Sequence, residues 1–313
     1  MITIAAALAP VLALILLGFG LRLSAFLPEY AWPAIERLTY FVLFPALLIH
    51  TLARNDPGEL PWPSILAAVV LALSAAVAAL LFWRRIRPSA NGAAFTSLFQ
   101  GGVRFNTYIA LAVIQALLGT DGVVAGAVVF GFMIPLVNLL CIGAFARWGS
   151  GAARGLRPFA IAVLANPLIL ACVAGWALGL SGIGLPGVTS DILEIIGRAA
   201  LPLGLLAVGA ALRPRQMLDH LHPAAVASVV QFGLKPVVAV ALASAFGFDA
   251  LLTAVFVITL MTPTAPSAYI LARQLGGDGP AMASIITLQT LLAFILMPAI
   301  MALALPELRI PPS

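Results

Sequence analysis

Charge is scarce in this sequence. Only 9% of its 313 residues are charged, whereas 63% are hydrophobic. A soluble domain usually has about a quarter of its residues charged, so the composition excludes an ordinary soluble protein. The long apolar runs instead indicate membrane spans of about 20 residues each. Because a span in lipid must satisfy its own backbone hydrogen bonds, we expect an all-α polytopic membrane protein.

Residues that carry chemistry are scarce as well. The two cysteines, Cys141 and Cys172, lie inside apolar runs, which is typical of small hydrophobic side chains and not of a disulfide or metal framework. The sequence has no H-E-x-x-H motif, and no Asp or Glu lies near the middle of any apolar run. Intramembrane proteases need one or the other. We therefore expect no enzyme activity and no cofactor.

Lysine occurs once, so fifteen of the sixteen basic residues are arginine. Most of these arginines form short clusters between apolar runs, which is typical of cytoplasmic loops. The net charge of +5 therefore does not indicate a nucleic-acid partner. No Lys or Arg precedes the first apolar run, so we interpret that run as a span and not as a cleaved signal peptide.

Ten apolar runs follow one another, separated by short loops. They lie at residues 3–23, 32–53, 62–83, 92–118, 122–146, 157–180, 190–212, 223–246, 249–274 and 280–305. The loops after the odd-numbered runs hold Arg22, Arg37, Arg84, Arg85, Arg87, Arg147, Arg154, Arg157, Arg213, Arg215 and Arg273, and the opposite face holds Arg54, Arg198 and Arg309. Positive loops usually stay inside, which predicts a protein of the cell (inner) membrane with both termini on the extracytoplasmic side.

A constant offset of 157 residues relates the two halves of the chain. It relates Pro10 to Pro167, Pro45 to Pro202, and the GTDG motif at Gly119 to the GGDG motif at Gly276. Each half holds five apolar runs, and an odd number means that the second half enters the membrane in the opposite sense. The sequence therefore predicts ten transmembrane helices in two inverted repeats, 1–156 and 157–313, an arrangement typical of secondary transporters.

Two of the ten runs are interrupted at equivalent positions. The fourth contains Gly101, Gly102, Arg104 and Asn106, and the offset carries Asn106 onto Pro263 in the ninth. Glycine weakens a helix and proline breaks it, and breaks at corresponding places indicate a transporter's binding site. The half-helix after each break would present free N–H groups, which favours an anion. The predicted substrate-binding residues are Gly102, Arg104, Asn106, Thr107, Thr262, Pro263, Thr264 and Ser267.

Arg104 is the most telling of these residues. It stands fifteen residues before Gly119 and sixteen after Pro88, so it lies roughly 22–24 Å along a helix from either end. An arginine at the centre of a span costs about 2.5–3.5 kcal/mol, which partners must offset. Without a central carboxylate in the chain, a substrate carboxylate is the expected partner. The alternative is that Arg104 binds carbonyl groups of its own broken helix.

Lys235 is equally central in the eighth run, and Gln231 lies one turn before it on the same face. In one interpretation its ammonium occupies the place of a coupling cation, neutralised by helix carbonyls that Pro236 frees. In the other it is a purely structural internal cation. Isolated polar residues such as Asn138 are expected to make helix–helix hydrogen bonds.

Three segments resemble the auxin efflux carrier family. They are FNTYI from Phe105, ALPLGLLAVGAAL from Ala200, and TPTAPSAYILARQLGGD from Thr262. The family includes plant auxin exporters and bacterial carriers of malonate or malate. The resemblance implies a fold like that of bile-acid sodium symporters, in which broken helices 4 and 9 cross. Spans 1, 2, 6 and 7 would form a scaffold domain that pairs as a homodimer, and spans 3–5 and 8–10 an elevator-type transport domain.

The sequence therefore predicts a secondary-active transporter of a small organic anion, such as malonate or malate, with its substrate at the helix 4/9 crossover. Its partners would be that carboxylate and the lipid bilayer. Sodium-coupled relatives use buried carboxylates that this chain lacks, so sodium coupling is not expected. The alternative is an efflux carrier for an auxin-like aromatic weak acid or a neutral solute, with Arg104 structural. The residues alone also leave a channel or a ligand sensor open.

Overall fold

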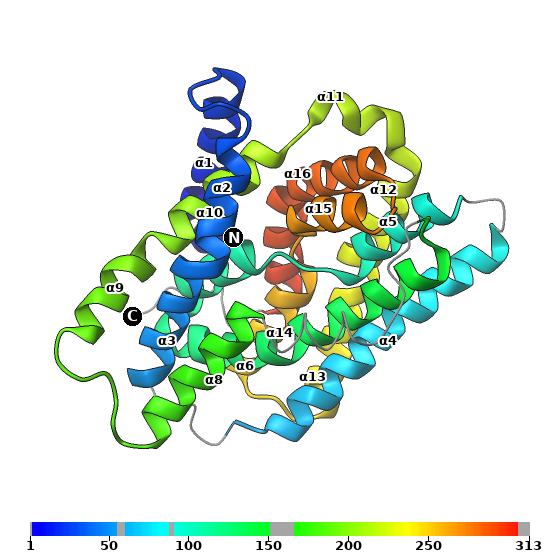
Figure 1. Ribbon diagram of the computed structural model, residues 1–313. Helices are drawn as coiled ribbons and strands as arrows, with labels where there is room; N and C mark the ends of the chain where they lie inside the picture. Colours follow the sequence, from blue (N-terminus) through cyan, green and yellow to red (C-terminus); the bar gives the residue numbers. More distant parts are fainter. Residues whose placement is uncertain (1, 55–59, 88–90, 151–165, 306–313) are drawn as a thin grey trace.

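The computed structural model describes residues 2–54, 60–87, 91–150 and 166–305, which form helices joined by short connections, with no strand among these residues (Figure 1). Six helical stretches are long and apolar enough to cross a membrane: Ala31–Arg54, Trp62–Ile86, Gly92–Trp148, Thr189–Ala211, Pro214–Ala245 and Gly279–Ala304. Shorter apolar helices lie at Leu8–Leu23, Pro167–Leu180 and Ala250–Met261. The described chain is thus that of a multi-pass membrane protein, as its composition predicts.

The described residues of the first half form five helical units, the last of which is one long helix. They are α1 (Ile2–Leu23), α2 (Ala31–Leu38) continued by the π-helical turn η1 (Thr39–Leu43) and α3 (Phe44–Arg54), α4 (Trp62–Ile86), α5 (Gly92–Val103) and α6 (Thr107–Trp148). Within α6, Gly119 has φ 63° and ψ −153°, so the chain leaves the helical conformation there. A positive φ is a conformation that glycine adopts without strain. This bend separates the predicted fourth and fifth spans.

The second half begins with α8 (Pro167–Leu180), α9 (Thr189–Arg198) and α10 (Ala200–Ala211). A continuous stretch follows, formed by α11 (Pro214–Met217), η2 (Leu218–His220), α12 (Leu221–Ser228), the π-helical η3 (Val229–Leu234) and α13 (Lys235–Ala245). The chain ends with α14 (Ala250–Met261), α15 (Ser267–Gln274) and α16 (Gly279–Ala304). Most of the segment 213–222, which the sequence predicts as a loop, is helical. Pro214 is compatible with this because it is the first residue of α11, where the backbone N–H makes no hydrogen bond within the helix.

Part of the predicted organisation falls outside the described residues. This applies to the repeat boundary at 156/157, to the beginning of the sixth span and to Pro88, Arg154, Arg157 and Arg309. The number of ten membrane helices and their inverted-repeat relation stay predictions. In Figure 1, α1, α2, α3, α9 and α10 gather on the left, and α4, α5, α12, α13, α15 and α16 on the right.

Glycine allows α1 and α10 to pack closely. A Cβ on Gly18 would collide with the backbone carbonyl oxygen of Leu206 in α10, and a Cβ on Gly209 would collide with that of Ile15 in α1. Small residues that bring two backbones together are the usual basis of helix association in lipid, where apolar burial alone contributes little. The contact is reciprocal, so each helix supplies one glycine and one carbonyl group.

We expect Gly18→Ala and Gly209→Ala to destabilise the protein by roughly 1–3 kcal/mol each, the usual range for overpacking, because the colliding atoms belong to the backbone and cannot rotate away. Thermal unfolding in detergent measures the effect. Gly20→Ala in the same helix is the matched control, since a Cβ on Gly20 would meet no atom within 4 Å. Equal melting temperatures for the Gly18, Gly209 and Gly20 variants would contradict this account of the interface.

Candidate substrate-binding site

Helix is interrupted at both places where the sequence predicts a break. α5 ends at Val103 and α6 begins at Thr107, while α14 ends at Met261 and α15 begins at Ser267. The first residue after each N-terminal half-helix is extended, with ψ of 164° at Arg104 and 147° at Thr262. Each break therefore leaves a helix C-terminus and a helix N-terminus inside the protein, with the backbone groups of both ends in need of partners.

Hydrogen bonds join the two breaks to each other. The Asn106 backbone N–H donates to Thr262 Oγ1 at 3.2 Å, and Thr264 Oγ1 donates to the Gly101 carbonyl at 3.1 Å. Gln289 on α16 completes the contact, because its Nε2 donates to the same carbonyl at 2.8 Å and its Oε1 accepts from Thr264 N at 2.9 Å. Protein groups thus satisfy the non-helical backbone at the two breaks, as is required of irregular backbone inside a membrane span.

The N-terminal end of α6 is capped by its own chain. Asn106 Oδ1 accepts hydrogen bonds from Tyr108 N at 3.0 Å and Ile109 N at 3.2 Å. The expectation that these N–H groups are free for an anion is therefore wrong, because Asn is a strong N-cap residue and satisfies them first. The Asn106 Nδ2 atom is buried and has no hydrogen-bond partner among the described residues.

The C-terminal end of α5 meets the buried ammonium of Lys235. Its Nζ donates to Gln231 Oε1 at 2.9 Å, to Arg104 O at 3.3 Å and to Val103 O at 3.5 Å, and the residue is fully buried. A cation suits this place because helix C-termini carry partial negative charge. The carbonyl groups are those of the last residue of α5 and of the first residue of the break, so the expectation that Pro236 frees them is wrong. The lysine stem is long enough to reach the broken helix beside it.

Gln231 extends the same arrangement to the other broken helix. Its Nε2 donates to Leu260 O at 3.1 Å and also to Thr262 O, which are carbonyl groups at the end of α14. The amide orientation is consistent, since Oε1 accepts from the ammonium while Nε2 donates to the carbonyls. Lys235 at the start of α13 and Gln231 in η3 therefore bind the C-terminal ends of α5 and α14, respectively, and are hydrogen-bonded to each other. π-helical turns are frequent at functional sites.

The two glycines before the break belong to the last turn of α5 and are themselves helical. A Cβ on Gly102 would lie 2.9 Å from Leu80 Cδ1 and 3.3 Å from Val230 Cγ1, and one on Gly101 would lie 2.6 Å from Ile285 Cγ2. Glycine is needed here for close packing against α4, η3 and α16. The break itself begins one residue after Val103, at Arg104.

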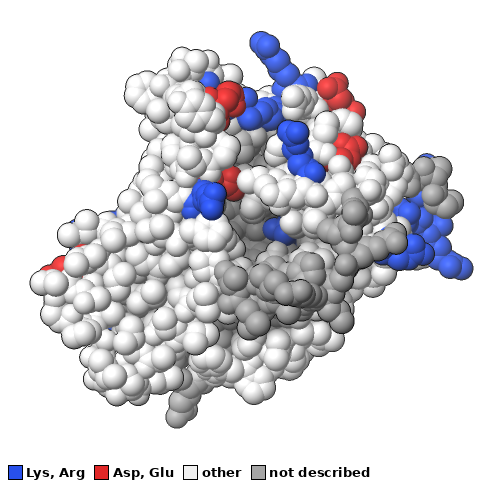
Figure 2. Space-filling view, in the orientation of Figure 1, with Lys and Arg blue, Asp and Glu red and all other residues white. Residues whose placement is uncertain are grey.

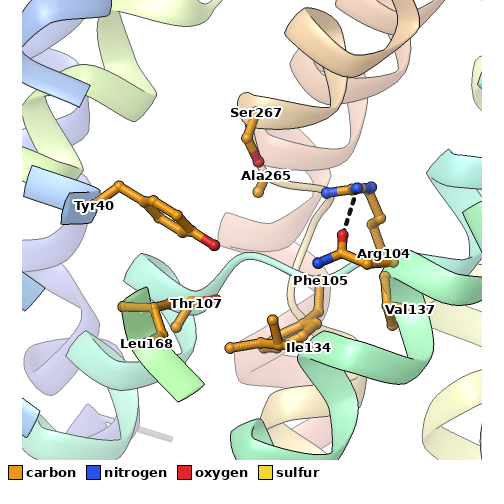
Figure 3. A pocket seen from close by; sticks show the side chains of 10 residues that line it. Tyr40, Arg104, Phe105, Thr107, Ile134, Val137, Leu168, Ala265 and Ser267 are labelled. Atoms are coloured by element: carbon orange, nitrogen blue, oxygen red, sulfur yellow. Dashed lines mark hydrogen bonds between the residues drawn. The ribbon is translucent and has the colours of Figure 1, made fainter. Parts of the chain in front are cut away.

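A pocket lies beside the crossover, on the side of the two helix N-termini. It encloses about 380 Å³ of free space, part of which is open to solvent, and Figure 2 shows a hollow with a basic side chain inside it on this face. The lining residues, shown in Figure 3, are Tyr40, Arg104, Phe105, Thr107, Ile134, Val137, Asn138, Leu168, Ala265 and Ser267. Arg104 is the only charged residue in this set.

Arg104 reaches the pocket from the first break and is held by α6. Its Nη2 donates to Asn138 Oδ1 at 2.9 Å, the dashed line of Figure 3. Its Nε is buried and has no hydrogen-bond partner among the described residues. Lys235, and not Arg104, binds the last carbonyls of α5. The guanidinium therefore has an N–H donor, at Nε, that no described residue accepts.

The predicted site residues divide into two groups. Arg104, Thr107 and Ser267 line the pocket. The others form the buried crossover behind it and do not line the pocket: Gly102, Asn106, Thr262, Pro263, Thr264, Gln231 and Lys235. Sequence reasoning missed two polar lining residues. Asn138 makes a hydrogen bond, as its isolated position predicts, and its partner is Arg104. Tyr40 offered no signal beyond a phenol in the first half of a predicted span.

A membrane-embedded chain with two joined helix breaks and a pocket beside them belongs to the class of membrane transporters, and comparison with known proteins agrees. The family model described as Membrane transport protein matches residues 3–301, so this chain belongs to that family, the auxin efflux carrier family. It is also similar to an uncharacterized transporter of Methanothermobacter thermautotrophicus, 26% identical over 296 residues, which cover 92% of this chain and 94% of the relative.

Proposed function

We propose that this transporter carries a small organic anion, a mono- or dicarboxylate such as malonate or malate, and that the anion binds to Arg104 in the pocket beside the crossover. The observation that supports this most directly is the buried, unpartnered Nε atom of Arg104 in a pocket lined by no carboxylate. A guanidinium binds a carboxylate through two parallel hydrogen bonds, and Nε with one Nη forms one such pair of donors.

The polarity of the crossover supports an anion as well. Thr107 and Ser267, the first residues of α6 and α15, line the pocket, so the positive ends of two helices face it. The negative ends of α5 and α14 are turned to the other side, where Lys235 and Gln231 bind them. Helix polarity and the arginine charge therefore favour the same sign of substrate.

The arrangement in Figure 1 supports an alternating-access mechanism of the elevator type. The helices gathered on the left are those of predicted spans 1, 2 and 7, which would form the scaffold, and those on the right belong to predicted spans 3, 4 and 8–10, which would move with the substrate. The reciprocal glycine contact between α1 and α10 would keep the scaffold rigid. A homodimer would form through the scaffold, and the protein would lie in the inner membrane with both termini outside.

The wild-type protein in proteoliposomes tests this proposal. We expect labelled malonate to enter in a saturable manner and to enter faster when unlabelled malonate is inside, because a carrier returns more quickly when loaded. Replacing sodium with N-methylglucamine should leave the rate unchanged, since Lys235 already supplies a cation at the crossover.

Two outcomes would contradict it. A rate of entry that rises linearly with malonate concentration and does not depend on unlabelled malonate inside the proteoliposomes would indicate a channel. Saturable entry of indole-3-acetate, with no entry of malonate, malate or a short monocarboxylate, would favour the alternative of an aromatic weak-acid carrier with a structural Arg104.

A further inference from the structure

Tyr40 faces Arg104 across the pocket. It lies in the π-helical turn η1, and Figure 3 shows its hydroxyl group pointing into the space that Arg104 enters from the other side. Both residues line the same pocket. Nothing in the proposed binding of a single carboxylate to Arg104 requires a phenol at this place.

Asn166 determines the direction of the hydrogen bond that Tyr40 makes. Asn166 Oδ1 caps α8, accepting from Leu168 N at 3.0 Å and from Ile169 N at 3.3 Å. Only an amide oxygen can accept from these two N–H groups, so the Nδ2 of the same side chain must point the other way. That Nδ2 lies 3.1 Å from the Tyr40 hydroxyl oxygen. Asn166 is thus the donor and Tyr40 the acceptor.

The phenolic proton of Tyr40 is therefore free to bind something else. A hydroxyl group donates one hydrogen bond, and here its oxygen already accepts one from Asn166. No described residue accepts the Tyr40 proton, and the hydroxyl faces the pocket. Donation from Asn166 also polarises the hydroxyl, which strengthens it as a donor.

The pocket consequently has hydrogen-bond donors at two opposite ends. Arg104 stands at one end and Tyr40 at the other, and the space between is lined by the apolar side chains of Phe105, Ile134 and Leu168 and by the hydroxyl-bearing Thr107 and Ser267. A molecule with a carboxylate at one end, one or two methylene groups, and a hydrogen-bond acceptor at the other end would satisfy both ends. An aliphatic monocarboxylate would satisfy only Arg104.

We propose that Tyr40, oriented by Asn166, is a specificity-determining residue that binds the second polar end of the substrate, so that the carrier prefers short acids with a distal carboxylate, hydroxyl or carbonyl oxygen. This inference rests on the proposed function and deepens it. Tyr40 binds the substrate directly, and Asn166 acts only through Tyr40, by deciding where the phenolic proton points.

Malonate and propionate provide the test, because both have three carbons and one carboxylate for Arg104, but only malonate has a distal acceptor. Affinities are measured as the concentration-dependent rise in melting temperature and as inhibition of labelled malonate uptake. We expect Tyr40→Phe to weaken malonate binding about tenfold or more, the usual effect of losing one hydrogen bond to a charged group, and to leave propionate within about twofold.

Asn166→Asp is the second variant. Its carboxylate still caps α8, where negative charge is favourable, but its other oxygen can only accept a hydrogen bond. It would take the Tyr40 proton away from the pocket, so we expect the same selective loss of malonate affinity although the phenol is intact. Tyr30→Phe is the control, because Tyr30 is 80% exposed and should change neither affinity.

The outcomes are distinct. A selective loss of malonate affinity in both variants supports the assignment. Unchanged malonate affinity in Tyr40→Phe, or an equal loss for malonate and propionate, overturns the role of Tyr40 and leaves the proposed function standing. Binding of neither acid to the wild-type protein overturns both.

Discussion

Arg104→Gln is expected to abolish carboxylate binding without unfolding the protein. A bidentate pair of charged hydrogen bonds contributes about 1.5–3 kcal/mol for each bond, so the loss should be 100-fold or more in affinity. The fold should survive, because Arg104 has no ion-pair partner among the described residues and its buried Nε is unpaired. Removing a half-buried charge that has no opposite charge beside it relieves a desolvation cost, and the hydrogen bond to Asn138 is the only side-chain contact among the described residues that is lost. We therefore expect an unchanged or higher melting temperature in the absence of substrate.

This combination separates the two interpretations of Arg104. A structural arginine would lower the melting temperature when replaced and would leave substrate affinity nearly intact. Arg104→Lys keeps the charge but loses the planar fork, so it should fall between wild type and Arg104→Gln in affinity. Arg85→Gln is the matched control for charge, since Arg85 is exposed at the end of α4. Malonate binding and thermal unfolding, measured on the same samples, provide both readouts.

Lys235→Ala is expected to make the protein dependent on a monovalent cation. The substitution leaves Gln231 Oε1 and the carbonyl groups of Val103 and Arg104 buried around an empty space. Each unsatisfied acceptor costs about 1–3 kcal/mol, and the negative ends of two helices lose their counter-charge. Unwound carbonyls and half-helix C-termini are the groups that bind sodium in other transporters. Sodium should therefore restore part of the stability.

The measurement is the melting temperature at increasing sodium concentration, with N-methylglucamine chloride holding the ionic strength constant. We expect the Lys235→Ala variant to be less stable than wild type and to gain stability with sodium, while wild type is indifferent. Lys235→Met is the matched control, because its side chain fills the space and leaves no room for an ion. A Lys235→Ala variant that is destabilised but gains nothing from sodium would rule out the interpretation that Lys235 occupies the place of a coupling cation and would leave a purely structural internal cation.

Much of the candidate binding region could be predicted because its residues depart from the composition of the rest of the chain. Arg104 and Lys235 are conspicuous in runs that otherwise hold no central charge, and Pro263 is conspicuous where a helix is expected. The repeat offset directed attention to two breaks at equivalent places. Such features are local, so a linear reading of the sequence detects them.

Tyr40 and Asn166 could not be predicted in the same way. A tyrosine near the end of a span and an asparagine before a proline are ordinary in a membrane protein, and 126 residues separate them along the chain. Their importance depends on which atom of the amide caps α8, and that orientation exists only when η1 and α8 lie side by side. Gly102 is also a case in which tertiary structure adds what the sequence lacks, because it lies outside the pocket and a Cβ there would meet the side chains of Leu80 and Val230.

The sequence by itself determined that this protein is a polytopic helical membrane transporter with two interrupted helices and an arginine between them, because composition, hydropathy and helix breakers act through local free energies that each segment carries alone. Only the tertiary structure decided how the polar groups are shared: Lys235 and Gln231 on the helix C-termini, Asn106 on its own helix, and Arg104 opposite Tyr40 in the pocket. Hydrogen bonds between distant segments require both partners at bonding distance, and no single segment contains that information.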